Sequence, residues 1–433
     1  MNVSPMEEKQ ILDKVHPEGK IPRMNDIDGL ISRLCPEGVP HEQMGEVGEF
    51  VRGSGLQKAD LKTEGMPAIH YGQIHTHYGV WATETISFVD VEFASRLRQA
   101  KPGDVILATT SEDDDAVGKA TAWLGDKNAA VSGDAFIYRH TLDARYVSYF
   151  LQSEDFQRQK ARHLTGAKVR RISRASLENI RIPVPPLEVQ REIVRILDKF
   201  TQLEAELEAE LEARQKQYAH YRDHLLTFAD SRESVRWVPM SEVGTFIRGG
   251  GPQKKDFVDQ GIGCIHYGQI YTHYGPYAHE TLSCIAPDVA ANSRMARPGD
   301  VVIAVTSEND EDLGKSVAWL GQDAVAISNH TLIYTSDLNP KFVAYFLSSE
   351  SFQVQKRRHI TGAKVRALPT KAFDSIQIPI PSRAVQNGVV QTLDSFDALV
   401  NDLSSGLPAE IVARRRQYEY YRDRLLTFKE LAS

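Results

Sequence analysis

Histidine, tyrosine, glutamine and threonine are concentrated in one stretch that occurs twice. Ile69-His-Tyr-Gly-Gln-Ile-His-Thr-His-Tyr-Gly79 returns as Ile265–Gly275, with Tyr271 in place of His75. Clustered histidines could bind zinc, but tyrosine is a poor replacement ligand. The shared donors, acceptors and aromatic faces are groups that contact base edges or phosphates. We expect nucleic-acid contact here, with loop packing and a metal site as the alternatives.

A second repeated stretch combines glycine with cations. Thr165-Gly-Ala-Lys-Val169 precedes Arg170 and Arg171, and Thr361-Gly-Ala-Lys-Val365 precedes Arg366. Glycine lets a loop approach a phosphate closely, threonine and backbone N–H groups donate hydrogen bonds, and the cations neutralise charge. A basic surface is often only solvated, but two copies of the same loop favour contact with DNA phosphates.

These patterns predict DNA-contacting side chains at matching positions of both copies. In the first copy the predicted DNA-binding residues are Arg52, Lys58, His70, Tyr71, Gln73, His75, Thr76, His77, Tyr78, Thr165, Gly166, Lys168, Arg170 and Arg171. In the second copy they are Arg248, Lys254, His266, Tyr267, Gln269, Tyr271, Thr272, His273, Tyr274, Thr361, Gly362, Lys364 and Arg366.

Acidic residues also cluster twice, at Ser111–Asp115 and Ser307–Asp312, ahead of Lys119 and Lys315. Acids with a lysine could serve a metal-dependent nuclease. The Glu-x-Lys spacing expected on one strand is missing, and Gly118 directly precedes the first lysine. We therefore favour a solvated loop.

Signatures of catalysis are missing elsewhere in the sequence. There is no Walker loop, no Gly-x-Gly-x-x-Gly after a strand and no His-Glu-x-x-His. Val184-Pro-Pro-Leu187 lacks the amide and the aromatic residue of the tetrapeptide that amino-methyltransferases use. We predict no catalytic residue, no metal site and no cofactor bound by this chain.

The candidate residues belong to a unit that is repeated along the chain. Glu46–Gly53 returns as Glu242–Gly249, and Lys101–Val105 as Arg297–Val301, each at an offset of 196 residues. Loops therefore keep their lengths as well as the elements. Within the first copy, turn residues bound the expected strands and helix. These are strands at 104–108, 121–124, 135–138 and 179–184, and a helix at 144–163.

A long helix is predicted over 187–228, because no Gly or Pro interrupts this run after Pro186 and Glu and Ala are strong helix formers. Its length would be about 60 Å. Arg414–Phe428 echoes Arg214–Phe228, so a second helix follows the second copy, with a break expected at Gly406 and Pro408. We predict an intramolecular coiled coil. Its predicted partner-facing residues are Phe200, Leu203, Leu207, Leu211, Tyr218, Tyr221, Tyr418 and Tyr421.

Composition is that of a soluble globular protein with two or three domains. The 433 residues show no apolar run long enough to cross a bilayer and no signal peptide, and three cysteines without metal-ligand spacing fit a reducing cytoplasm. The net charge is −7, but residues 158–174 carry seven cations and no acid. Charge distribution, not net charge, therefore bears on DNA binding.

The chain resembles the specificity (S) subunit of type I restriction-modification systems, the HsdS family. The resemblance rests on the domain–helix–domain–helix order, the junction Ile182-Pro-Val-Pro-Pro-Leu-Glu-Val-Gln190, the tandem Leu-Glu-Ala-Glu units and the Arg-Gln-Tyr…Leu-Leu-Thr-Phe helix ends. It covers nearly everything after the first residues. The second junction, Ile378–Gln386, departs slightly from the pattern.

The resemblance implies an α+β fold with two similar α/β target recognition domains separated by two long antiparallel helices, a pseudo-two-fold internal repeat. The implied segments are a polar lead-in (1–24), recognition domain 1 (25–185), a central spacer helix (186–228), recognition domain 2 (229–381) and a C-terminal spacer helix (382–433).

The implied function is non-catalytic recognition of double-stranded DNA, each domain reading half of a bipartite site. The helices would set the spacer and dock two methyltransferase (M) subunits, and motor-nuclease (R) subunits would complete the complex. S-adenosylmethionine, Mg²⁺ and ATP are expected on those partner subunits. No contact with a membrane is expected.

The close match of the two copies predicts near-palindromic half-sites. Differences at His75/Tyr271, Ser54/Gly250 and Asp134/His330 allow the halves to differ. Two alternatives remain, a self-contained metal-dependent DNA endonuclease and an adaptor that does not bind DNA.

Overall fold

The computed structural model describes residues 29, 31–229, 234–401 and 406–431, so the lead-in predicted over 1–24 lies outside the described residues. The chain forms two compact units. Unit 1 comprises the described residues up to Glu206 together with those from Val412 onwards, and unit 2 comprises Leu207–Ile411.

A five-stranded sheet forms the centre of unit 1, in the order β2-β11-β7-β9-β4. Its strands are β2 (Gly48–Arg52), β11 (Ala135–His140), β7 (Val105–Ala108), β9 (Ala120–Trp123) and β4 (Trp81–Ala82). All neighbours are antiparallel except β4 and β9, which are parallel. The strands expected near 104–108, 121–124 and 135–138 are thus confirmed.

Strand β7 reads Val-Ile-Leu-Ala without polar alternation because both of its faces are buried. Val105 and Leu107 pack into a core shared with Tyr146 of a covering helix, whereas Ile106 packs on the opposite face with Ile74. The sheet therefore has two apolar layers, and the second layer supports the histidine-rich stretch.

Smaller sheets and helices complete the first domain. A four-stranded sheet has the order β5-β3-β10-β6, and β1 pairs with β13 and β8 with β12. The strands are β5 (Ser87–Val89), β3 (Met66–Ile69), β10 (Ala129–Val131), β6 (Gln99–Ala100), β1 (His41–Gln43), β13 (Arg181–Pro183), β8 (Thr110–Ser111) and β12 (Arg170–Arg171). The helices are α3 (Met44–Val47), η1 (Lys58–Asp60), α4 (Tyr71–Thr76), α5 (Val91–Ala94), α6 (Ala144–Phe150), α7 (Glu154–Ala161) and α8 (Arg174–Glu178).

The single helix expected over 144–163 is wrong in one respect, since the structure has α6 and α7 there. The Ser153 hydroxyl accepts a hydrogen bond from Phe156 N and begins a new helix. Serine competes with helical backbone bonds and is favoured at N-caps, which explains the break.

Unit 2 repeats this architecture with sheets β15-β25-β21-β23-β18 and β16-β19-β17-β24-β20 and the pairs β14-β27 and β22-β26. The strands are β14 (Arg236–Pro239), β15 (Gly244–Arg248), β16 (Phe257–Val258), β17 (Ile262–Ile265), β18 (Tyr277–Ala278), β19 (Ser283–Ile285), β20 (Arg294–Ala296), β21 (Val301–Ala304), β22 (Thr306–Ser307), β23 (Ser316–Trp319), β24 (Val325–Ile327), β25 (Thr331–Ser336), β26 (Arg366–Ala367) and β27 (Gln377–Ile380). The helices are α10 (Met240–Val243), η2 (Lys254–Asp256), α11 (Tyr267–Thr272), α12 (Pro287–Ala291), α13 (Pro340–Ser348), α14 (Glu350–Lys356), η3 (Arg357–His359) and η4 (Thr370–Asp374).

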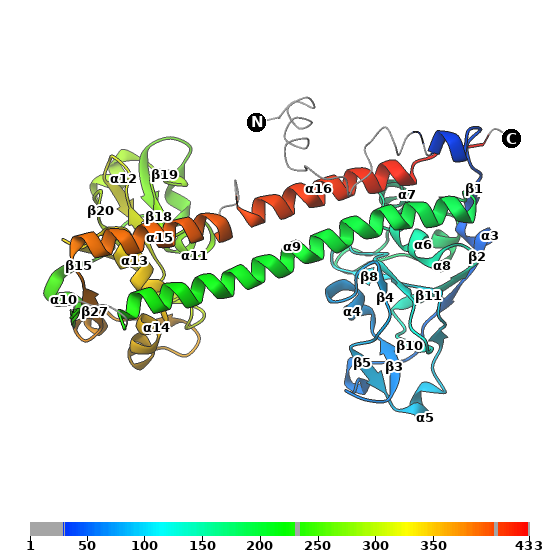
Figure 1. The fold of residues 1–433 in the computed structure, drawn as a ribbon, viewed down its shortest axis with the longest axis horizontal. Coiled ribbons are helices and arrows are strands. Elements are labelled where there is room, and N and C mark those ends of the chain that lie inside the picture. Colours follow the sequence, from blue (N-terminus) through cyan, green and yellow to red (C-terminus); the bar gives the residue numbers. More distant parts are fainter. Residues whose placement is uncertain (1–28, 30, 230–233, 402–405, 432–433) are drawn as a thin grey trace. The chain divides into compact units, whose positions relative to one another are not determined.

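Long helices follow each domain. Helix α9 runs without interruption over Leu187–Thr227, as Figure 1 shows, so the predicted central helix is confirmed. After the second domain, α15 (Arg383–Asn401) and α16 (Leu407–Leu426) are separate helices. The break falls where Gly406 and Pro408 predicted it, and Pro408 stands in the first turn of α16, where its missing N–H costs nothing.

Within each unit two of these helices pack antiparallel. In unit 1, Phe200 of α9 contacts Tyr421 of α16 at 5.2 Å between ring centroids, and further along Glu204 pairs with Arg415. In unit 2, Tyr221 of α9 stacks on Phe396 of α15 at 5.3 Å. The central leucines Leu203, Leu207 and Leu211 are half-buried. The predicted antiparallel pairing is thus observed inside each unit.

Candidate nucleic-acid interface

The histidine-rich stretch forms helix α4, and its first residues fix the helix start. His70 Nδ1 accepts a hydrogen bond from Gly72 N at 3.2 Å, while His70 N donates to Gln73 Oε1 at 3.0 Å. Gln73 Nε2 donates to Ser87 Oγ at 2.6 Å. Burial lowers the pKa of His70, which keeps the ring neutral and able to accept. His266 and Gln269 repeat these bonds at the start of α11.

Later side chains of the stretch also point into the protein. His75 Nε2 lies 3.0 Å from Thr110 O, and the Tyr78 hydroxyl accepts from Ile86 N at 3.1 Å. Tyr78 is only 5% exposed. For Gln73, His75 and Tyr78 the loop-packing alternative therefore accounts for the observed contacts, and their contact with DNA stays a prediction.

In the second copy the same inward bonds recur. The Tyr271 hydroxyl donates to Thr306 O at 2.7 Å, and the Tyr274 hydroxyl accepts from Leu282 N at 2.8 Å. The members of the stretch that face solvent are Thr76, His77, Thr272 and His273. Their contact with DNA stays a prediction.

A hollow of about 340 Å³ adjoins the start of α4 in unit 1. It brings together two cations, two aromatic rings, a carboxylate and several backbone groups. Its lining residues are Arg52, Gly55, Leu56, Gln57, Lys58, His70, Tyr71, Ser132, Gly133 and Asp134. Four of the predicted DNA-binding residues of the first copy, Arg52, Lys58, His70 and Tyr71, thus line one concave site.

The glycine-containing basic stretch forms a tight hairpin, which we call the basic hairpin (residues 165–171, and 361–367 in unit 2). Thr165 and Arg171 exchange backbone hydrogen bonds of 3.0 and 2.9 Å. Gly166 has φ +93°, and a Cβ there would lie 2.2 Å from Val169 O, so only glycine fits the turn. Gly362 has the same geometry, with φ +89°.

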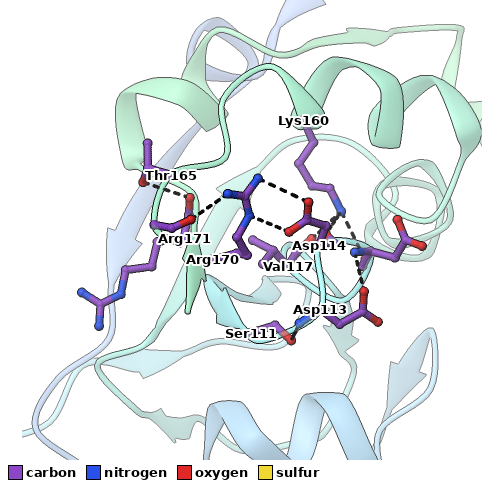
Figure 2. Close-up of polar contacts among 10 residues, drawn as sticks. Ser111, Asp113, Asp114, Val117, Lys160, Thr165, Arg170 and Arg171 are labelled. Carbon is purple, nitrogen blue, oxygen red and sulfur yellow. Dashed lines mark hydrogen bonds and ion pairs between the residues drawn. The ribbon is translucent and has the colours of Figure 1, made fainter. Parts of the chain in front are cut away.

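The cations of the basic hairpin have different roles (Figure 2). Arg170 Nε donates to Asp114 Oδ1 at 2.6 Å and Arg170 Nη1 to Gly166 O at 2.6 Å, so this side chain holds the hairpin together. Arg366 is paired in the same way with Asp310. Lys168, Arg171 and Lys364 are exposed, and in Figure 2 the guanidinium of Arg171 points away from the acidic side chains. These exposed cations are the ones available to phosphate.

The acidic loop (residues 111–118) is held through its backbone by a buried lysine. Lys160 Nζ donates to the carbonyl oxygens of Asp114, Asp115 and Val117 at 2.8, 3.1 and 2.8 Å, as Figure 2 shows in part. Lys160 is 2% exposed, and burial lowers its pKa to about 8. Lys356 holds the equivalent loop through Glu311 O and Leu313 O. The sequence showed Lys160 only as one of the cations in residues 158–174. Its role in holding the acidic loop could not be predicted, because that loop lies far from Lys160 along the chain.

The lysine that the sequence placed beside the acids has another contact. Lys119 Nζ donates to His75 O, at the end of α4, at 3.0 Å. Lys315 does pair with Asp312, at 2.6 Å. Among the residues that the structure describes, no group of three or more His, Cys, Asp or Glu side chains is placed to hold a metal ion. Cys35, Cys264 and Cys284 are free thiols.

Backbone contacts join the hollow, α4 and the basic hairpin into one surface. Thr109 N donates to Asp134 O at 2.9 Å, and Ile172 N donates to Thr109 O at 3.1 Å, so one residue links the edge of the hollow to the hairpin. Thr110, which follows, pairs with Arg171 across β8 and β12 and contacts His75. We call this surface, from the hollow to the basic hairpin, the candidate interface.

Unit 2 joins the equivalent residues in the same way. Val305 N donates to His330 O and Leu368 N to Val305 O, both at 2.9 Å. The molecule therefore carries related cationic surfaces on two domains of one fold, with Ala367 in the place of Arg171, and each domain is connected to long helices. These features define an internally duplicated protein with two equivalent candidate binding surfaces.

Comparison with known proteins agrees with that class. The model of the type I restriction modification DNA specificity domain family matches residues 42–213 and 304–413. The chain is 33% identical over 302 residues to the type I restriction enzyme EcoR124I/EcoR124II specificity subunit of Escherichia coli, covering 66% of this chain and 70% of that subunit. This chain belongs to the type I restriction-modification specificity-subunit family, which confirms the resemblance seen in the sequence.

Two further similarities extend over more of the chain. A putative type I restriction enzyme specificity subunit of Haemophilus influenzae is 26% identical over 343 residues, covering 72% of this chain and 78% of that protein. A solved chain, described under complex assembly and conformational transition of the type I R-M system, covers 90% of this chain and 98% of its own length. Its TM-score is 0.59 at 18% identity, which shows a shared fold.

Proposed function

We propose that this chain selects the DNA sequence on which a type I restriction-modification complex acts. Each domain reads one half of a bipartite, near-palindromic site in double-stranded DNA. The observation that supports this most directly is the duplicated candidate interface, in which exposed cations adjoin aromatic and hydrogen-bonding groups. Cations position a protein on phosphates, and hydrogen-bonding side chains distinguish bases.

The long helices would perform the second part of the proposed function, which is to set the spacer between half-sites and to dock the partner subunits. Helix α9 is the covalent connection between the two domains, so its length bears on the spacer between half-sites. Exposed apolar side chains on the helices, such as Leu399 and Val412, suit the docking of two methyltransferase subunits. Motor-nuclease subunits would complete the assembly, and membership of the family supports both partners.

We propose further that the chain is non-catalytic and works in the cytoplasm. S-adenosylmethionine, Mg²⁺ and ATP would bind to the partner subunits. In support, the acidic loop that could have served a nuclease is bound through its backbone by Lys160 and through Asp114 by Arg170. No helix in the described part of the chain is long and apolar enough to span a membrane.

The test is base-resolution mapping of N6-methyladenine in DNA from cells that express this chain with its neighbouring methyltransferase. We expect a bipartite, near-symmetric methylated motif that disappears when the chain is deleted. Methylation that does not change on deletion would contradict the proposal. Metal-dependent DNA cutting by the isolated chain would then favour an endonuclease, and salt-insensitive partner binding without DNA would favour an adaptor.

A further inference from the structure

The two copies differ at several positions in and beside the candidate interface, among them His75/Tyr271, Ser54/Gly250, Gly133/Asn329, Asp134/His330 and Arg171/Ala367. The first two of these differences leave the contacts unchanged. His75 and Tyr271 differ in chemistry, yet both contact the carbonyl oxygen of the matching threonine, Thr110 or Thr306. The substitution therefore exchanges one way of holding the helix for another. Because both side chains bond inward, this difference between the copies does not change the groups that face solvent.

Ser54 and Gly250 also perform one task. Arg98 N donates to Ser54 Oγ at 2.7 Å, and the equivalent Arg294 N donates to Gly250 O at 2.8 Å. The same backbone amide is satisfied from the same turn in both copies. A Cβ at Gly250 would meet its nearest heavy atom, in Arg294, at 3.9 Å, so serine would fit there as well.

Asp134 against His330 exchanges an acceptor for an imidazole at the edge of the hollow, whereas Arg171 against Ala367 removes a cation from the basic hairpin. The backbones are equivalent, since Asp134 O accepts from Thr109 N and His330 O accepts from Val305 N. The side chain of Asp134 is 44% exposed at the edge of the hollow. His330 Nδ1 lies 3.1 Å from Thr306 Oγ1, and its ring meets the Tyr267 ring edge-on at 5.3 Å.

Stability does not account for either side chain. Asp134 is 4.0 Å from Arg52, and both groups are more than two-fifths exposed, so this ion pair contributes little to folding. His330 has φ +70°, and a non-glycine residue in the left-handed region is held there at a cost. Strained residues of this kind cluster at binding and catalytic sites.

The position lies between the two parts of the candidate interface. In unit 1, Arg52, Lys58 and Tyr71 line the hollow beside Asp134, and Thr109 links Asp134 to the basic hairpin. A carboxylate only accepts hydrogen bonds, so it suits the amino group of cytosine or adenine. An imidazole can donate to the N7 or O6 acceptors of guanine, which a carboxylate would repel.

Resting on the function proposed above, we propose that Asp134 and His330 are specificity-determining residues that read a base at which the two half-sites differ. Asp134 selects a base with an exposed amino group in one half-site. His330 selects a different base at the symmetry-related place in the other half-site. Substitution at either position therefore changes one half of the motif and leaves the other half and the spacer unchanged.

The experiment uses the full chain with its methyltransferase partner and maps N6-methyladenine at base resolution. Asp134→His should change the preferred base at one position of one half-site, and His330→Asp should change the other half-site. Asp134→Asn keeps the shape of the side chain but adds a donor, so it should relax the preference at that base. A base contact of this kind corresponds to about a five- to 150-fold change in relative methylation.

Ser54→Gly and Gly250→Ser are the matched controls, because they also exchange residues between the copies, but at a position where either residue accepts from the same backbone amide, that of Arg98 or Arg294. Both should leave the motif unchanged. An unchanged motif in Asp134→His and Asp134→Asn, with methylation retained, would overturn the inference, as would an equal change in the controls. If Asp134→His fails to assemble, Asp134→Asn decides alone. If the wild-type chain itself directed no methylated motif, that result would instead contradict the proposed function.

Discussion

At the scale of single residues, many polar side chains that appear free in the sequence are committed to the fold. Gln73, His75 and Tyr78 are spaced as a ligand-contacting set would be, yet each bonds inward to hold α4 or its neighbouring loop. A sequence shows the types and spacing of such residues. It does not show which backbone atom lies opposite them, because that depends on the tertiary contacts of distant strands.

His140 supplies a prediction at this scale, because the repeat provides its own control. It lies at the end of β11, its ring is tilted against that of Tyr138 with 4.9 Å between centroids, and it is replaced by Ser336 at the end of β25. Burial lowers the pKa of His140 from 6.5 to about 4. As the pH falls below about 6.5, His140 binds a proton in the unfolded chain but stays neutral in the folded chain. The stability contributed by the neutral, buried His140 is therefore complete above pH 6.5 and is lost as the pH falls towards 4.

We therefore expect His140→Ser to make unit 1 less sensitive to acid. The difference in unfolding free energy between variant and wild type should shift in favour of the variant by at most about 3 kcal/mol between pH 7.5 and 4. Hydrogen-exchange protection of the β11 peptide measures this shift. The β25 peptide is the internal control and should respond equally in both proteins. A pH-independent difference at β11 would refute the prediction.

At the scale of elements, the C-terminal end of each long helix contacts the domain that it does not directly follow. The end of α9 contacts the second domain, and the end of α16 contacts the first domain. Glu154 N, at the start of α7 in unit 1, donates to Asp423 Oδ1 of α16 at 2.9 Å. Glu350 N, at the start of α14 in unit 2, donates to Asp223 Oδ1 of α9 at 3.0 Å. The sequence predicted the helices and their echo, but the repeat alone left open which domain each helix end contacts.

This arrangement predicts separable effects of two equivalent substitutions. Asp423→Ala should leave Glu154 N without its acceptor and destabilise the start of α7 by about 0.5–2 kcal/mol, as loss of a helix cap does. Hydrogen exchange in the α7 peptide should accelerate about two- to 30-fold, while α14 stays unchanged. Asp223→Ala should do the reverse. The assignment would be wrong if either variant affected both helices equally.

At the scale of the whole molecule, the constant offset between the copies made the duplication predictable, because loops of equal length imply equal topology. The two-domain class, the continuous α9 and the break before α16 followed from periodicity, Gly and Pro. The division of α6 from α7 and the fixing of the acidic loop by Lys160 did not. Those features depend on a single serine cap and on a contact between residues about 45 positions apart.

The tandem Leu-Glu-Ala-Glu units of α9 carry the last prediction. Deleting residues 207–210 removes about 6 Å of helix and nearly one whole turn, leaving a residual rotation of about 40°. Both candidate interfaces lie outside the deleted segment. We therefore expect the methylated motif to keep both half-sites and to change its spacer by about one or two base pairs.

Methylation mapping of this deletion decides whether helix length sets the spacer. The variant Glu208→Gln with Glu210→Gln alters charge in the same segment but keeps its length, so its motif should match that of the wild type. A deletion that changed half-site bases at constant spacing would contradict the role of α9. It would mean that the helix acts through the domains that it connects and not through its length, since the bases are the property that the candidate interfaces should fix.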